Sequence, residues 1–386
     1  MSEWKEVKLG DLVSIKYGKD HKSLSDGVFP VFGSGGLMRK VDSYIYDKPS
    51  LLIPRKGTLN NIIYTEEKFW TVDTMFWTKV DELKTSAKFL YYYLKDFNFN
   101  ALNVGSAVPS LTVPVLNDID IKLPSTDKQS DIVGILSSLD AKIETNNKLN
   151  EKLEEMAQAI FKSWFVDFEP FKDKPFHETE LGMIPEAWEV KRISENDFYI
   201  SDFVSNGSFA SLKQNVTLLD YPDYAYFIRN TDLKVGKFKV YVNKESYDFL
   251  SKSKLIGGEI IISNVGDVGS VFLCPKLEKP MTLGNNIIMI KPSNEIFKYY
   301  LFQYFSSPIG QYMIDGISGG SVQRKFNKTD FRAMKILIPS KNILMNYYNI
   351  IKPIFDFKEE LGKENDRLAS LRDTLLPRLM SGELIV

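Results

Sequence analysis

The sequence predicts an α+β protein in which two mixed α/β domains are separated by two long antiparallel helices that form a coiled coil. Three observations support this pseudo-twofold fold class. A long amphipathic pattern lies in the middle of the 386-residue chain, a second copy lies near its C-terminal end, and each copy follows a region of strand and turn signals. This period is too large for a solenoid, and it suits two halves related by a twofold axis.

The central amphipathic pattern covers residues 127–164. Its apolar residues recur at steps of three and four, which places them on one stripe of a helix. Gly134 is its one glycine and it has no proline, so the segment predicts a single helix about 57 Å long. Leu149 and Trp164 lie on the stripe, and the residues expected to pair with a second helix are Ile132, Leu136, Leu139, Ile143, Leu153, Met156 and Ile160.

The second copy preserves the register of the first at an offset of 215 residues, which superposes Pro124 on Pro339. Pro353 lies inside the pattern, so the second helix is expected to start or kink there. Phe355 stands where the first copy has Asp140, so strict symmetry of the two helices is not expected. The pairing residues expected in this copy are Ile351, Ile354, Leu361, Leu368, Leu371 and Leu375.

Amphipathic helices of this length also form homodimeric coiled coils. Two copies in one chain favour the intramolecular pair, because each helix then meets its partner at a high effective concentration.

Strand and turn signals place one mixed domain before each helix. In the first domain, strands are expected at 50–54, 61–65 and 76–80, and a helix at 86–96. A segment rich in proline and aromatic residues then links the central helix to the second domain, where 258–266 matches 49–57 and 297–306 matches 88–97. The span from Trp188 to Pro339 exceeds that from Trp4 to Pro124, so similar helices carry domains of unequal size.

Composition indicates a cytoplasmic protein without a membrane span. No run of 18 apolar residues and no secretory leader is present, and the single cysteine, Cys274, excludes an internal disulfide and a cysteine-based zinc site. The net charge of −1 argues mildly against nucleic-acid binding. However, residues 127–162 carry seven acidic residues and five lysines, which leaves the domains more basic than the average.

The sequence shows no pattern that predicts catalysis. His21 and His177 lack partners at metal-ligand or triad spacing, and no phosphate-binding G-x-x-x-x-G-K-[ST] motif occurs. Asp223 followed by Asp232-Leu-Lys234 imitates a nuclease motif, but such short patterns are common. We therefore expect a non-catalytic chain with no metal site.

Two conserved-looking blocks resemble the specificity (S) subunits of type I restriction-modification systems. The first is D-K-Q-x-x-I-x-x-I-L-x-x-L-D-x-K-I, which runs on into N-x-x-L-E-x-M-A-Q-A-I-F-K-S-W-F-V-D-F-E-P. It is similar to the central conserved region of that family. The second, T-L-L-P-R-L-M-S-G-E-L at residues 374–384, is similar to its C-terminal conserved region.

The resemblance implies a sequence-specific DNA-binding subunit whose two domains each recognise half of a bipartite target, while the helices set the spacer and dock methyltransferase subunits. It implies double-stranded DNA, two methyltransferase subunits and restriction subunits as partners, and it assigns S-adenosylmethionine, ATP and Mg²⁺ to those subunits. The alternative is a coiled-coil scaffold that joins two protein-binding domains. The expected parts are target-recognition domain 1 at 1–125, the central conserved helix at 126–169, a linker at 170–185, target-recognition domain 2 at 186–340 and the C-terminal conserved helix at 341–386.

Recognition of DNA requires phosphate contacts and a few side chains that can reach base edges. Loops rich in such residues occur in both domains, and the run from Gly316 to Phe326 is the most specific, because its glycines permit close backbone approach and basic residues follow them. The same run is also compatible with a solvated loop. The expected DNA-binding residues are Lys19, Lys22, Arg55, Lys56, Asn60, Ser106, Ser110, Asn264, Ser321, Gln323, Arg324 and Lys325.

Overall fold

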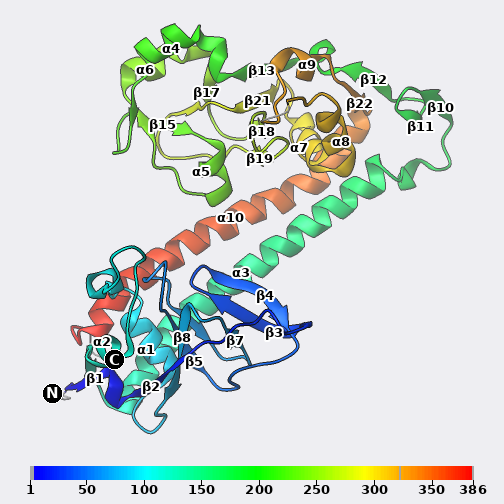
Figure 1. The fold of residues 1–386 in the computed structure, drawn as a ribbon. Helices are drawn as coiled ribbons and strands as arrows, with labels where there is room; N and C mark the ends of the chain where they lie inside the picture. Colours follow the sequence, from blue (N-terminus) through cyan, green and yellow to red (C-terminus); the bar gives the residue numbers. More distant parts are fainter. Residues whose placement is uncertain (1–3, 321–322, 385–386) are drawn as a thin grey trace. The chain divides into compact units, whose positions relative to one another are not determined.

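The computed structural model describes residues 4–320 and 323–384, which form two compact units. The first unit contains the described residues up to Lys148 together with those from Leu361 onward, and the second contains Leu149–Glu360. Each unit consists of a mixed domain and one end of each of the two long helices (Figure 1).

The first unit is built on a four-stranded antiparallel sheet with the order β2-β8-β5-β6. A three-stranded sheet, β4-β3-β7, and the antiparallel pair β1-β9 complete its strands. Leu51 and Phe76 of the main sheet pack with Phe89 and Leu90 of α1 in one buried cluster. Its elements are β1 (Lys5–Lys8), β2 (Val13–Tyr17), β3 (Asp26–Gly33), β4 (Gly36–Val41), β5 (Ser50–Pro54), β6 (Ile63–Thr65), β7 (Trp70–Thr71), β8 (Met75–Val80), α1 (Ala87–Leu94), α2 (Val113–Asn117), β9 (Asp120–Leu123) and the start of α3 (Thr126–Phe165).

The second unit repeats this plan and adds to it. Its four-stranded sheet, β13-β21-β18-β19, and its pair β12-β22 correspond to β2-β8-β5-β6 and β1-β9. A five-stranded sheet, β14-β16-β15-β20-β17, has no counterpart of the same size in the first unit and accounts for the longer second domain.

The linker forms a separate hairpin of β10 and β11. The elements of this unit are β10 (Phe176–Thr179), β11 (Gly182–Pro185), β12 (Glu189–Arg192), β13 (Phe198–Asp202), α4 (Phe209–Asn215), β14 (Leu218–Leu219), β15 (Ala225–Ile228), α5 (Asn230–Val235), β16 (Tyr241–Val242), α6 (Lys244–Phe249), β17 (Lys254–Leu255), β18 (Ile260–Ser263), β19 (Val271–Leu273), β20 (Met281–Leu283), β21 (Ile287–Pro292), α7 (Lys298–Ser306), α8 (Pro308–Gly316), α9 (Lys328–Ala333), β22 (Lys335–Ile338) and the start of α10 (Lys341–Met380).

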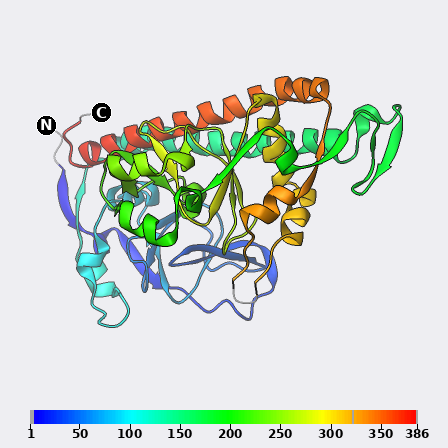
Figure 2. The same cartoon turned by 90° about the horizontal axis from the view of Figure 1, so that it is seen from above.

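The long helices α3 and α10 lie alongside each other in both views and run antiparallel within each unit (Figures 1 and 2). In the first unit, Arg372 Nη1 donates to Asp140 Oδ1 at 2.7 Å, and Asn146 Nδ2 donates to Asn365 Oδ1 at 2.9 Å. In the second unit, Glu154 forms an ion pair with Lys358. The residue number on α10 falls as that on α3 rises, as an antiparallel pair requires. Each helix has 40 residues and is about 60 Å long.

Most residues expected to pair the helices are removed from solvent. Ile132, Leu136, Leu153, Ile351 and Leu361 are buried. The half-buried ones are Leu139, Ile143, Ile160, Ile354, Leu368 and Leu375.

The expectation was wrong for Met156 and Leu371, which are 53% and 48% exposed. These two residues occupy equivalent positions at the 215-residue offset, so the same error occurs in both copies. The next residue along each helix turns inward instead: Ala157 is fully buried, and Arg372 forms an ion pair across the seam. A hydrophobic pattern predicts that Met156 and Leu371 face the partner helix. In the structure, Ala157 and Arg372 face it instead.

The helix α10 passes through Pro353, so the expectation that it would start there was wrong. Proline removes the hydrogen bond to the carbonyl four residues earlier, which here belongs to Asn349. Both residues are exposed, so water can bond that carbonyl. Among the described residues, no helix combines the length and the apolar character that a membrane span requires.

A polar contact fixes the helix pair against the first domain. Asp140 accepts hydrogen bonds from the Tyr92 hydroxyl at 2.6 Å and from Arg372 at 2.7 Å. Burial has the largest single effect and would raise the pKa of Asp140, but these two hydrogen bonds and the positive charges of Lys95 and Arg372 together hold the pKa below its ordinary value. The carboxylate is therefore stabilised in its charged form.

The corresponding contact in the second unit is aromatic. Phe355 lies at the position of Asp140, and its ring meets Phe302 of α7 edge to face at 5.6 Å. The same ring stacks on Tyr299 at 4.6 Å. Ala157 takes the place of Arg372. One packing position is thus filled by polar groups in the first unit and by aromatic rings in the second.

Candidate nucleic-acid interface

In the first unit, the fold brings the loop after β5 against the loop before α2. Gly57 N donates to Pro109 O at 3.0 Å, and Leu111 N donates to Arg55 O at 2.9 Å. Lys56 and Ser110 form an isolated antiparallel bridge between these hydrogen bonds. The predicted residues Arg55, Lys56 and Ser110 are therefore neighbours, although half of the domain separates them in sequence.

Asparagine side chains hold these loops in shape. Asn103 Oδ1 accepts from Gly105 N at 2.9 Å and from Ser110 N at 2.8 Å. Asn60 is a predicted DNA-binding residue, and its Oδ1 accepts a hydrogen bond from Asn100 N at 3.2 Å. This oxygen is therefore already bonded within the protein. Ser106 is exposed on the loop that Asn103 closes.

The segment that carries Lys19 and Lys22 lies beside Arg55. Lys19 N donates to Thr71 O at 2.8 Å, and Arg55 Nη1 donates to Asp73 O at 3.0 Å two residues further along. Both lysines are exposed. The two segments border a cavity of about 680 Å³, lined by Asp20, His21, Lys22, Gly33, Ser34, Gly35, Met38, Val72, Asp73 and Thr74. Of the predicted residues, Lys22 belongs to this lining, and Arg55 is connected to it through its hydrogen bond to Asp73.

In the second unit, the loop after β18 meets the loop before α9 with the same hydrogen bonds. Gly266 N donates to Arg324 O at 2.9 Å, and Phe326 N donates to Asn264 O at 3.0 Å. Lys325 forms bridges to Val265 and Gly319. The two hydrogen bonds and the bridge to Val265 reproduce those of Gly57, Leu111 and Ser110 in the first unit.

The two loops therefore share one backbone frame over the described residues, in which residues 104–105 and 108–111 correspond to 319–320 and 323–326. Tight turns support this correspondence: a Cβ added to Gly105 would lie 2.1 Å from Val108 O, and one added to Gly320 would lie 2.4 Å from Gln323 O. The side chains differ, because Val108 and Pro109 stand where the second unit has Gln323 and Arg324. Gln323, Arg324 and Lys325 are all exposed.

Asn264 holds the loop frame in place. Its Nδ2 donates to Phe326 O at 3.1 Å, and its Oδ1 is buried without a hydrogen-bond partner. The structure thus turns this amide toward the protein, and its contact with DNA stays a prediction. Ser321, another predicted residue, lies outside the described residues.

The segment that imitates a nuclease motif has structural contacts. Asp232 is buried and accepts from the Arg229 side chain, and Lys234 forms an ion pair with Asp267 at 2.6 Å. Hydrogen bonds from Lys234, Ser270 and Asn230 lower the pKa of Asp267 to about 2. Within the described ranges, no cluster of three or more histidine, cysteine, aspartate or glutamate residues could hold a metal ion.

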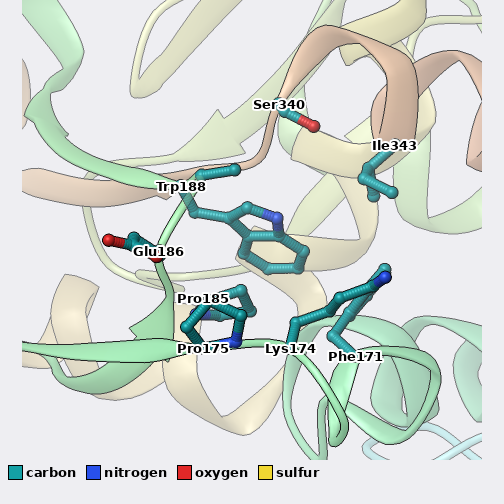
Figure 3. Close-up of a pocket in the computed structure, with 9 residues that line it drawn as sticks. Phe171, Lys174, Pro175, Pro185, Glu186, Trp188, Ser340 and Ile343 are labelled. Carbon is teal, nitrogen blue, oxygen red and sulfur yellow. The ribbon is translucent and has the colours of Figure 1, made fainter.

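A second cavity, of about 370 Å³, lies in the second unit around Trp188, where the linker meets the start of α10 (Figure 3). Phe171, Pro175, Pro185 and Ile343 provide apolar walls, while Lys174 and Glu186 supply charged groups. This lining lacks the array of amide and basic donors seen at the loop clusters, so those loops stay the candidate nucleic-acid interface.

The structure thus combines two repeated domains and a pair of long helices with exposed loops that share a backbone frame, which are features suited to recognition of a two-part DNA site. The sequence matches the family model of the type I restriction modification DNA specificity domain twice, at residues 1–155 and 185–368. The chain therefore belongs to the type I restriction-modification DNA specificity family. Its function in that family is DNA recognition and not catalysis.

Individual relatives agree with this assignment. The chain is 27% identical over 364 residues to the type I restriction enzyme MjaIX specificity subunit of Methanocaldococcus jannaschii. The aligned region covers 89% of this chain and 79% of the relative. The chain is 26% identical over 349 residues to the HindI specificity subunit of Haemophilus influenzae, covering 75% and 74%. The crystal structure of a type I restriction-modification S subunit from M. genitalium matches with a TM-score of 0.59 at 18% identity, over 98% of this chain and 96% of that one. This last match shows a shared fold.

Proposed function

We propose that each domain of this specificity subunit recognises one half of a bipartite DNA target. The observation that carries this proposal is the pair of loop clusters, which share a backbone frame and differ in side chains. A shared frame would place both loops in the same way against a duplex, while different side chains would select different bases. The target is accordingly an asymmetric sequence in two parts.

The basic and amide side chains divide between two kinds of DNA contact. Exposed Lys19, Lys22, Lys56 and Lys325 suit phosphates, which fix the register of the protein on the duplex. Gln323 and Arg324 suit base edges in the major groove, because both side chains can form paired hydrogen bonds there.

The paired helices would set the spacer between the half-sites and dock two methyltransferase subunits. Apolar side chains on the helix surfaces support the docking role, because several large ones remain exposed in this chain alone. In the second unit these are Leu149, Met156, Met345, Ile350 and Phe357. Restriction subunits would join the same complex, and those partners, rather than this chain, would bind S-adenosylmethionine, ATP and Mg²⁺. The complex would act on DNA in the cytoplasm.

Methylome sequencing of the host with and without this gene tests the proposal. One bipartite methylated motif should disappear when the gene is deleted, and return when the gene is supplied on a plasmid. An unchanged methylome in a host that expresses the matching methyltransferase would contradict the proposal.

A further inference from the structure

In the second loop cluster, hydrogen bonds fix both the backbone and the side chain of Arg324. Its carbonyl accepts from Gly266 N at 2.9 Å. On its C-terminal side, Lys325 exchanges two hydrogen bonds with Gly319, each of 2.9 Å, and Phe326 is buried. These contacts hold the backbone at Arg324 in place, so its side chain starts from a fixed position.

Asp315 fixes the side chain. Its Oδ1 accepts from Arg324 Nη2 at 2.5 Å. Asp315 lies in the last turn of α8, whose start is capped by Ser307 and whose Ile314 is fully buried. Ser318 N donates to the Asp315 carbonyl at 3.1 Å, which closes the helix end. The carboxylate is thus attached to a rigid element and holds one nitrogen of the guanidinium.

The remaining guanidinium donors are available for recognition. A guanidinium carries five N–H donors in a planar fork, and this pair uses one nitrogen. The Arg324 side chain is 53% exposed, so its other edge can meet a ligand. A planar fork held at one edge loses little further freedom when the other edge binds.

The neighbouring carboxylate favours a base over a phosphate as that ligand. Asp315 is 59% exposed, and its negative charge would repel a phosphate that bound the same guanidinium. A guanine edge is neutral, and its O6 and N7 acceptors match two parallel guanidinium donors. Resting on the proposed function, we infer that Arg324 reads a guanine in the major groove of the second half-site and that Asp315 is its positioning residue.

The first unit lacks this device. Pro109 occupies the position of Arg324 and has no side-chain donor, while Val108 is 54% exposed at the position of Gln323. We therefore assign the inferred guanine contact of Arg324 to the second half-site.

The test uses the full chain assembled with its methyltransferase subunits and duplexes that carry each base in turn at every position of the methylated motif. Arg324→Ala should relax the requirement for guanine at one position of the second half-site, lowering discrimination by about 5- to 150-fold. Asp315→Asn should relax the same position while total binding to non-specific DNA stays equal or rises. The first half-site should be unchanged in both variants.

Lys325→Ala is the matched control, because it removes a neighbouring positive charge and should weaken binding evenly over all sequences. The inference is overturned if Arg324→Ala also weakens binding evenly and lowers the salt slope by about one phosphate contact without relaxing any base. It is equally overturned if Asp315→Asn leaves discrimination intact. Failure of the proposed function is a separate result, in which the unaltered complex shows no bipartite motif at all.

Discussion

The two units fill the same position between helix and domain with opposite chemistry. In the first unit, Asp140 is charged and accepts hydrogen bonds from Tyr92 and Arg372. In the second unit, Phe355 packs its ring against Phe302 at the equivalent place. The repeat therefore preserves geometry and not residue type, because either a satisfied ion pair or an aromatic cluster can fill the space.

The loop clusters show the same division between frame and side chains. The hydrogen bonds from Gly57 N to Pro109 O and from Gly266 N to Arg324 O join equivalent pairs of loops. The side chains that project from those loops differ in charge and size. At the helices such differences are compensated inside the protein, whereas at the loops they lie on side chains that are exposed to solvent.

Phe355→Ala should produce the larger loss of stability. Removal of a buried aromatic ring costs about 3–5 kcal/mol, because both its contacts and the space it filled are lost. Phe357→Ala, two residues away on the same helix, is the control: its side chain is 42% exposed and should cost under about 1 kcal/mol. Denaturant unfolding of the isolated chain measures both. Equal losses in the two variants would show that the aromatic contact does not hold the second unit together.

The polar contact of the first unit should be sensitive to acid, with a smaller effect. The folded state lowers the pKa of Asp140 below its ordinary value of about 4, so its contribution is complete above that pH and is lost as the pH falls through the folded pKa. Asp140→Asn should therefore be less stable than the unaltered chain at pH 7, by about 1–3 kcal/mol.

Thermal unfolding at pH 7, 4 and 3 measures this difference. The gap in stability between the unaltered chain and Asp140→Asn should narrow as the pH falls below about 4, since the carboxyl group is then protonated in the unfolded chain first and in the folded chain as the pH falls through its lowered pKa. A gap that stays constant down to pH 3 would show that the charge of Asp140 does not contribute.

The sequence was sufficient to predict the repeat and the long helices, because these depend on periodicity over many residues. The expected helix at 127–164 lies within α3 (Thr126–Phe165), and the expected strand at 50–54 is β5. The matched segments 49–57 and 258–266 contain β5 and β18, the strands that precede the two loop clusters. Local patterns thus located the loops that the fold brings together.

Polar residues at the helix seam were beyond such patterns. Asn146 is buried and pairs with Glu364 and Asn365, yet its residue type predicts a surface position. Ala157 and Arg372 were missed for the same reason, since neither a small residue nor a cation raises the hydrophobic signal. The hydrogen bonds that satisfy Asn146 and Arg372 come from the other helix, so only the folded pair reveals them.

The sequence predicted which loops carry the candidate site, but not how the side chains of those loops are arranged. Gly-rich runs with basic neighbours indicated where donors gather, as at Gly319 and Gly320 before Arg324. The inward turn of Asn264 and the pairing of Arg324 with Asp315 depend on backbone contacts between distant segments. Spacing in the sequence carries no information on such contacts.

The proposed function requires that the two domains recognise their half-sites independently. Replacement of residues 186–339 by the matching domain of a relative with a different target, followed by methylome sequencing, tests it most directly. If the domains act independently, one half of the bipartite motif changes to that of the relative, while the other half and the spacer between them stay the same. A change in both halves would show that the domains do not recognise their half-sites independently.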